Sequence, residues 1–230
     1  MSKSKVSLLD SLSFQEFQDD AEFIPLMSSE DEEQMNNEEL PEILPILPLR
    51  NTVLFPGVVV PITAGRDKSI KLINQTNKEG KIIGVVSQKE EGEEDPGIED
   101  INTIGTVAKI LKVLKMPDGN TTVIIQGKKR FQVAEVITTE PYLTATVRGV
   151  EEARPAKDNE EFLVIVETIK EKSLAIIKDS PNIPSDASFA IKNIESPSFL
   201  INFVSSNLNI SVAQKQSLLQ INDLQERALE

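Results

Sequence analysis

The stretch Ile46–Ile62, ILPLRNTVLFPGVVVPI, constrains the fold more than any other part of the chain. Valine, isoleucine and phenylalanine favour strands, but proline cannot donate to a sheet ladder and is confined to edges, strand starts and bulges. Pro48 and Pro61 therefore predict edge strands rather than flat central ones. Pro56-Gly57 predicts a tight turn, because proline fixes φ and glycine supplies a positive φ. Two short strands around a turn are typical of a small curved sheet or an open barrel.

The β-rich region continues well beyond this stretch. A continuous apolar run at 81–88 predicts a buried central strand. Strands at 106–116 and 121–126 flank a Pro-Asp-Gly-Asn turn and predict a hairpin, although the lysine spacing in the first of them is nearer to helical. Clean alternation at 131–137 and 142–147 predicts two further strands.

The periodicity changes from strand to helix after a linker at 151–157. Apolar residues recur at helical spacing from Phe162 to Ile177 and predict a long helix, with Asp158 and Glu161 as its N-terminal capping pair. Further capping patterns predict four shorter helices that start near 186, 197, 212 and 224. We therefore expect an α+β chain, with a β-rich domain at 43–152 and an α-helical domain at 153–230.

Residues 1–42 carry most of the negative charge. Twelve Asp or Glu residues and two Lys give this segment a charge of −10, whereas the whole chain has a net charge of −13. Like charge with low hydrophobicity favours disorder, so we expect a solvated acidic tail. The alternative is a short docking segment, because Phe14 and Phe17 are three residues apart and would be neighbours on one face of a helix. The net charge argues against nucleic acid as a partner, because phosphate backbones repel a negative chain.

The residue inventory excludes most kinds of catalytic site. The chain has no His and no Cys, so it cannot build a Ser-His-Asp triad, a thiol nucleophile, or an imidazole or thiolate metal site. Its glycine–lysine pairs lack the earlier glycine of a P-loop. No apolar run is long enough to span a bilayer. We expect a cytoplasmic protein with no catalytic residue, no metal, no cofactor of its own and no membrane contact.

A series of short motifs runs across most of the chain. The motifs are Leu47-Pro48-Leu49-Arg50-Asn51, Phe55-Pro56-Gly57, Pro61, Gly65-Arg66, Val86-Ser87-Gln88, Ile104-Gly105-Thr106-Val107-Ala108, Pro117-Asp118-Gly119, Gly127 with Arg130, Lys215-Gln216, Leu218-Leu219 and Glu226-Arg227. In this order and spacing they resemble the N-terminal domain of Lon ATP-dependent proteases. The resemblance covers about residues 46–230 and leaves out the acidic extension at 1–42.

The resemblance implies a fold and a setting. It implies a small mixed β pseudo-barrel of the PUA-like type followed by a helical bundle that is truncated at its C-terminal end. It also implies a longer bacterial parent protein, whose ATPase and serine–lysine protease modules follow this region. Proteases of this family are homohexamers that degrade damaged and regulatory proteins. ATP, magnesium and the catalytic residues would therefore belong to the parent, and this fragment would be a monomer or a weak dimer.

We expect the chain to recognise unfolded or damaged proteins for delivery to an ATPase ring. Such substrates offer apolar side chains and backbone groups without a fixed shape, so a receptor needs exposed apolar patches and free strand edges. The candidate contact residues are Leu49 and Pro61 on the proline-bordered strands, and Leu114, Met116 and Pro117 near the predicted hairpin tip.

Two other functions remain open at this point. One is a freestanding PUA-like binding module, for example for RNA, which would use the basic cluster Lys128-Lys129-Arg130 beside Phe131. Phe131 begins an alternating strand, however, which favours a place in the core. The other is a hydrolase based on a carboxylate pair of the acidic loop at 89–100 or on a serine–lysine dyad, and no residue is marked for either role.

Overall fold

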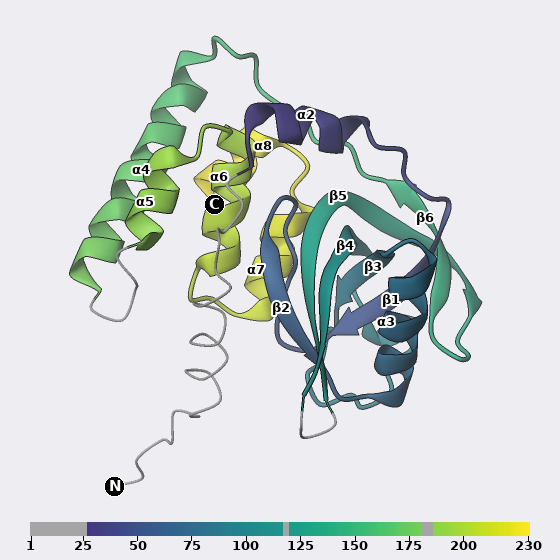
Figure 1. Cartoon of the computed structure of the whole chain (residues 1–230). Helices are drawn as coiled ribbons and strands as arrows, with labels where there is room; N and C mark the ends of the chain where they lie inside the picture. The colour runs from purple at the N-terminus through teal and green to yellow at the C-terminus, as the bar shows by residue number, and fades with distance from the viewer. Residues whose placement is uncertain (1–26, 117–119, 181–185) are drawn as a thin grey trace, which may run out of the picture.

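The computed structural model describes residues 27–116, 120–180 and 186–230 (Figure 1). Within these ranges it contains six strands in one mixed sheet and seven α-helices, so the predicted α+β class is confirmed. The strands are β1 Ile43–Leu49, β2 Val59–Ala64, β3 Ile82–Ser87, β4 Ile104–Lys115, β5 Thr121–Thr138 and β6 Thr144–Gly149. The helices are α2 Ser29–Asn37, α3 Asp67–Glu79, α4 Glu160–Asp179, α5 Asp186–Asn193, α6 Pro197–Asn207, α7 Val212–Gln220 and α8 Leu224–Leu229.

The sheet closes on itself into a small barrel. Its strand order is β2-β5-β4-β3-β1-β6, and the long strand β5 pairs with β6 as well as with β4 and β2. Every pairing is antiparallel except that of β1 with β3. Helix α3 packs on the barrel and buries Leu72 and Ile73 in the same apolar cluster as Ile83 and Ile125. Closure removes most exposed sheet edges, which otherwise invite aggregation.

The prolines of the first two strands have different surroundings. Pro61 lies in β2, at the end of the strand order, as the edge prediction requires. Pro48 lies in β1, which the strand order places between β3 and β6, so the prediction of an edge strand is wrong for β1 as a whole. Residues 43–45 of β1 pair with β6 and residues 46–49 pair with β3. Each half of β1 therefore pairs with one neighbouring strand. A stretch of strand that is paired on one side can accommodate a residue without an N–H group.

The β4–β5 hairpin is longer than predicted. Residues 121–138 form one continuous strand where the sequence predicts two. The strand assignment of β4 is confirmed, and its lysine spacing has a structural cause. A register shift between Ile110 and Lys112 inserts one extra residue, Leu111, into the strand. Lys109 and Lys112, three positions apart, therefore point to the same side of the sheet, as in a β-bulge.

The helical part follows the predicted order. The α4 cap is Asn159 rather than Asp158: the Asn159 side chain accepts a hydrogen bond from the backbone N–H of Phe162 at 3.0 Å. Ser196 caps α6 ahead of its proline, and Ser211 begins the predicted capping box of α7. The caps confirm that local side-chain chemistry sets the helix starts. Within the described ranges, no helix combines the length and hydrophobicity needed to cross a membrane.

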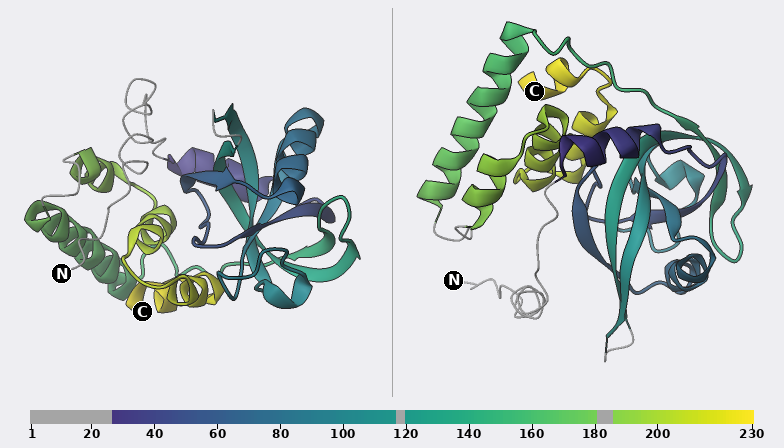
Figure 2. Two further views of the ribbon diagram at one scale, coloured as in Figure 1. Left: turned by 90° about the horizontal axis from the view of Figure 1, so that it is seen from below. Right: turned by 45° about the horizontal axis from the view of Figure 1, so that its top comes forward.

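The structure corrects one part of the predicted acidic tail. Residues 29–37 form helix α2, which lies across the junction of the barrel and the helices (Figures 1 and 2). A capping box starts the helix: the Ser28 hydroxyl accepts from the Asp31 N–H at 3.1 Å, and the Asp31 carboxylate accepts from the Ser28 N–H at 3.2 Å. Met27 and Met35 are buried. The rest of the tail, with Phe14 and Phe17, lies outside the described residues.

Candidate functional site

Three of the five predicted contact residues lie on one face of the sheet. Pro61 of β2 is paired with Ile124 of β5, and Leu114 of β4 is paired with Thr122. Paired residues point to the same side of a sheet, and so do residues two positions apart on one strand. Pro61, Ile124 and Leu114 therefore share a face. Met116, two positions after Leu114, belongs to it as well.

We call this surface the outer sheet face and define it by Pro61, Leu114, Met116 and Ile124. Pro61 is exposed, and the other three side chains are half-buried. Leu111, the extra residue of the bulge, is 42% exposed beside them. The opposite side of the same strands is closed, because its residues pack in the barrel core. Those residues are Val60, Ile62, Ile110, Val113, Val123 and Ile125.

The two other predicted contact residues are not part of this face. Leu49 is only 3% exposed and packs in the barrel core with Leu47 and Leu54. It cannot contact a partner in this conformation, because its half of β1 runs inside the closed sheet. Pro117 lies outside the described residues. The outer sheet face thus keeps Pro61, Leu114 and Met116 and gains Ile124, whose alternating position in β5 could have marked it.

The barrel and the helices share a second apolar cluster. Phe55, in the loop between β1 and β2, is fully buried in it with Phe199 of α6 and Leu219 of α7. Met27 and Met35 complete the cluster from the α2 side. The two parts of the chain therefore pack against each other through a shared apolar cluster.

A polar network crosses the same junction around Glu152. This carboxylate pairs with Arg227 of α8 at 2.9 Å and with Arg154 at 3.1 Å, and it accepts a hydrogen bond from the Ser198 hydroxyl at 3.0 Å. Arg227 also donates to the Asn202 side-chain oxygen at 3.0 Å. Burial lowers the pKa of Arg227, and the neighbouring Glu152 carboxylate opposes that shift. The network positions α8 and α6 on the segment that leaves the barrel after β6.

Arg130 ties β5 to the end of α7. Its guanidinium donates to the carbonyl oxygens of Leu219 and Ile221, at 2.9 Å each, and to the Asn222 side chain at 3.2 Å. Burial, with a smaller contribution from nearby Arg227, lowers the pKa of Arg130 to about 10. Arg130 therefore stays charged at neutral pH and is a structural cation. In the sequence, Arg130 is visible as part of a basic cluster, and no local pattern marks this role.

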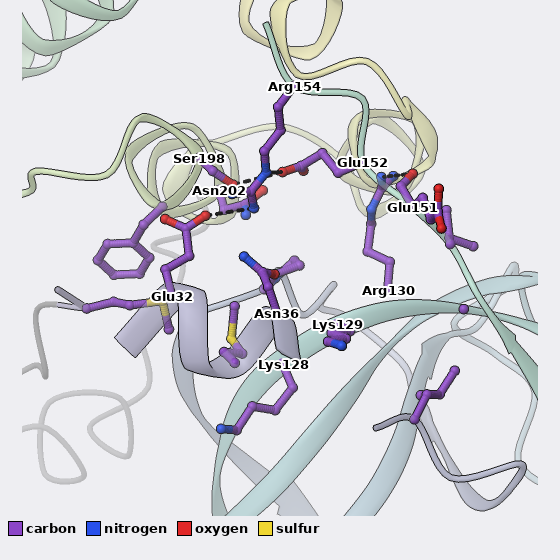
Figure 3. Close-up of a pocket in the computed structure, with 17 residues that line it drawn as sticks. Glu32, Asn36, Lys128, Lys129, Arg130, Glu151, Glu152, Arg154, Ser198 and Asn202 are labelled. Atoms are coloured by element: carbon purple, nitrogen blue, oxygen red, sulfur yellow. Dashed lines mark hydrogen bonds and ion pairs between the residues drawn. The ribbon is translucent and has the colours of Figure 1, made fainter. Parts of the chain in front are cut away.

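A cavity of about 710 Å³ lies between α2, β5, α6 and the segment after β6 (Figure 3). Figure 3 shows Glu32 and Asn36 of α2 facing Arg154, Ser198 and Asn202 on the other wall. Both basic and acidic side chains line it. They are Lys128, Lys129, Arg130 and Arg154, with Glu32, Glu151 and Glu152.

The arrangement does not favour the two other functions. Phe131 is fully buried and offers no ring for base stacking, while Lys128 pairs with Glu38 at 3.1 Å. In the acidic loop, Glu94 pairs with Arg50 and Asp95 with Lys68, all at the surface. No described group of His, Cys, Asp and Glu side chains is arranged to hold a metal ion.

Comparison with known proteins identifies related sequences. The family model described as the ATP-dependent protease La (LON) substrate-binding domain matches residues 43–230. The Lon protease of Flavobacterium johnsoniae is 66% identical over 230 residues, which are 100% of this chain and 28% of that protein. The Lon protease of Cytophaga hutchinsonii is 47% identical over 207 residues, 90% of this chain and 26% of that protein. The chain therefore spans less than a third of the length of these relatives.

Two solved structures share the fold. The N-terminal domain of Mycobacterium avium complex Lon protease matches with a TM-score of 0.66 at 24% identity, over 81% of this chain and 94% of that chain. The Lon N-terminal domain protein from Xanthomonas campestris matches with a TM-score of 0.58 at 19% identity, over 80% of this chain and 94% of that chain. At these identities the likeness supports the barrel-and-helices architecture.

Proposed function

Because this chain belongs to the family of ATP-dependent protease La (LON) substrate-binding domains, we propose that it binds unfolded or damaged proteins through the outer sheet face. The observation that carries the proposal is the gathering of Pro61, Leu114 and Met116 on one accessible face of the sheet, where Lys112 lies beside them. The chain would hold its substrate and perform no reaction on it.

The chemistry of this face suits an unfolded chain. Leucine, isoleucine and proline offer apolar surface without a shaped pocket, and methionine adapts to different side chains. β2 has β5 as its one strand neighbour among the described residues, so an extended peptide could also add to the sheet at its edge. Such contacts are weak singly and gain strength when several copies of the domain hold one polypeptide.

We also propose the setting that the resemblance implies. The chain would be part of a longer Lon-type protease that assembles as a hexamer in the bacterial cytoplasm. ATP, magnesium and the catalytic serine and lysine would belong to other modules of that protein, and the barrel would deliver substrates to its ATPase ring. The chain alone would be a monomer or a weak dimer.

Crosslinking to an unfolded protein tests the binding proposal. The chain is mixed with a reduced and alkylated model protein, treated with a lysine-reactive crosslinker, and mapped by mass spectrometry. Lys109, Lys112 and Lys115 of β4 report on the outer sheet face, while Lys172 and Lys192 report on the helices. We expect crosslinks concentrated on the β4 lysines. Crosslinks confined to the helical lysines, or equally frequent with the folded form of the model protein, would contradict the proposal.

A further inference from the structure

We propose that the surface under α2 is a second binding site, specific for an acidic helical peptide with two apolar residues, and that α2 of this chain occupies it in cis. The surface is formed by Lys128, Lys129, Arg154, Ser196 and Phe199. It differs from the outer sheet face, so the inference does not rest on the proposed function.

Two methionines anchor the α2 segment. Met27 and Met35 are both buried, in the cluster that contains Phe55 and Phe199. Methionine is unbranched and polarizable, and it fills irregular apolar sites without a fixed shape. The surface therefore accepts two apolar side chains of similar length from another segment of this kind, one just before a helix and one within it, eight residues apart.

Charge complementarity holds the segment between these anchors and just after the second one. Glu32 is only 7% exposed; its carboxylate pairs with Arg154 at 2.7 Å and accepts a hydrogen bond from the Ser196 hydroxyl. Glu38 pairs with Lys128, and its backbone carbonyl accepts from Lys129. Residues 27–42 contain seven Asp or Glu and no Lys or Arg. The partner chemistry is thus an acidic segment, because a basic one would leave Lys128 without its carboxylate and Arg154 with Glu152 as its one carboxylate partner in the part of the chain that the structure describes.

Three observations indicate that α2 is a replaceable occupant. The cavity of about 710 Å³ beside it shows that α2 fills the surface incompletely. α2 has nine residues, and a helix of this length is marginal without its docking contacts. The family match begins at residue 43, so α2 lies outside the part of the chain that the family model covers. A tethered segment keeps a high effective concentration at its site, so a competing peptide must bind with several contacts at once.

The test uses the full chain and a labelled peptide of residues 27–42, MSSEDEEQMNNEELPE, added in trans. Glu32→Arg places a cation against Arg154 and releases α2. Glu33→Arg, at the exposed next position of the same helix, is the matched control. We expect the peptide to bind E32R at least ~10-fold more tightly than the wild type or E33R, as loss of one buried pair predicts.

Three results would overturn the proposal. They are a folded E32R variant that binds no more tightly than the wild type, equal affinity for E33R, and equal affinity for a scrambled peptide of the same composition. If E32R fails to fold, amide hydrogen exchange of the wild-type chain replaces it. Excess peptide should then accelerate exchange at residues 29–37, and unchanged exchange there would overturn the proposal.

Discussion

Arg227 and Glu152 form an ion pair across the junction of the two parts, with 2.9 Å between Nη1 and Oε2. Arg227 lies in the last helix and has no exposed side-chain surface, while Glu152 lies in the segment that leaves the barrel. The same carboxylate also binds Arg154 and Ser198. One acidic side chain thus connects α8, α6 and the segment that follows β6.

Removing this arginine should destabilise the whole molecule. Arg227→Met takes the buried guanidinium partner away from the partly buried Glu152 carboxylate. We therefore expect a loss of about 3 kcal/mol in the free energy of unfolding. Urea unfolding followed by circular dichroism measures the change. Arg148→Met, at an exposed arginine of β6, is the control and should stay within about 0.5 kcal/mol of the wild type. A loss below about 1 kcal/mol for R227M would show that the pair does not hold the junction.

Gly127 should tolerate no side chain. A Cβ atom there would overlap the backbone carbonyl of Phe55, which is fixed by the buried Phe55 ring. We expect Gly127→Ala to cost about 2 kcal/mol, as overpacking of a filled core does. Gly92→Ala is the control, because nothing lies within 4 Å of a Cβ at that loop position. Equal thermal midpoints for the two variants would contradict the close approach of β5 to the β1–β2 loop.

Much of the fold follows from local sequence patterns. Strand alternation predicts the sheet, and the capping serines 196 and 211 predict the starts of α6 and α7. Local patterns do not predict the pairings that close the barrel. The rule that proline marks an edge strand fails for Pro48, because β1 lies inside the strand order. The half-and-half pairing of β1 with β3 and β6 depends on residues about 40 and 100 positions away.

The functional surfaces show the same division between local and distant information. Pro61, Leu114 and Met116 could be selected as apolar residues on edge or hairpin positions, but only the register shows that they share a face. Leu49 has the same local pattern and is buried. The role of Arg130 depends on carbonyl groups at the end of α7, 89 and 91 residues along the chain. Helix α2 was missed because composition alone carries no information about the surface that covers its methionines.

Acid should loosen the start of α2. Hydrogen bonds from the Ser28 side chain and backbone lower the pKa of Asp31. The folded pKa is below the unfolded one, so the cap contributes above the usual pKa of about 4 and is lost as pH falls through the folded value. Amide exchange at residues 29–37, corrected for its intrinsic pH dependence, should therefore show less protection at low pH. Ser28→Ala should reduce this pH dependence, and an unchanged profile in S28A would exclude the cap as a source of it.

Charge on the outer sheet face should weaken substrate binding. We expect Leu114→Asp and Met116→Asp each to lower the affinity for a reduced and alkylated model protein by ~10-fold, since an apolar contact of about 1.4 kcal/mol is lost. Both side chains are half-buried, so thermal stability should change little. Leu163→Asp, at an exposed leucine of α4, is the control. Fluorescence anisotropy measures the affinity, and a collapsed melting temperature for M116D would instead place Met116 in the core.

Amide hydrogen exchange of the full chain, with and without the reduced and alkylated model protein, tests the outer sheet face most directly. The binding proposal predicts slower exchange at residues 59–64 and 111–126 when the unfolded protein is present, with little change in α4 and α5. Protection confined to the helices, with unchanged exchange in β2 and the β4–β5 hairpin, would contradict it.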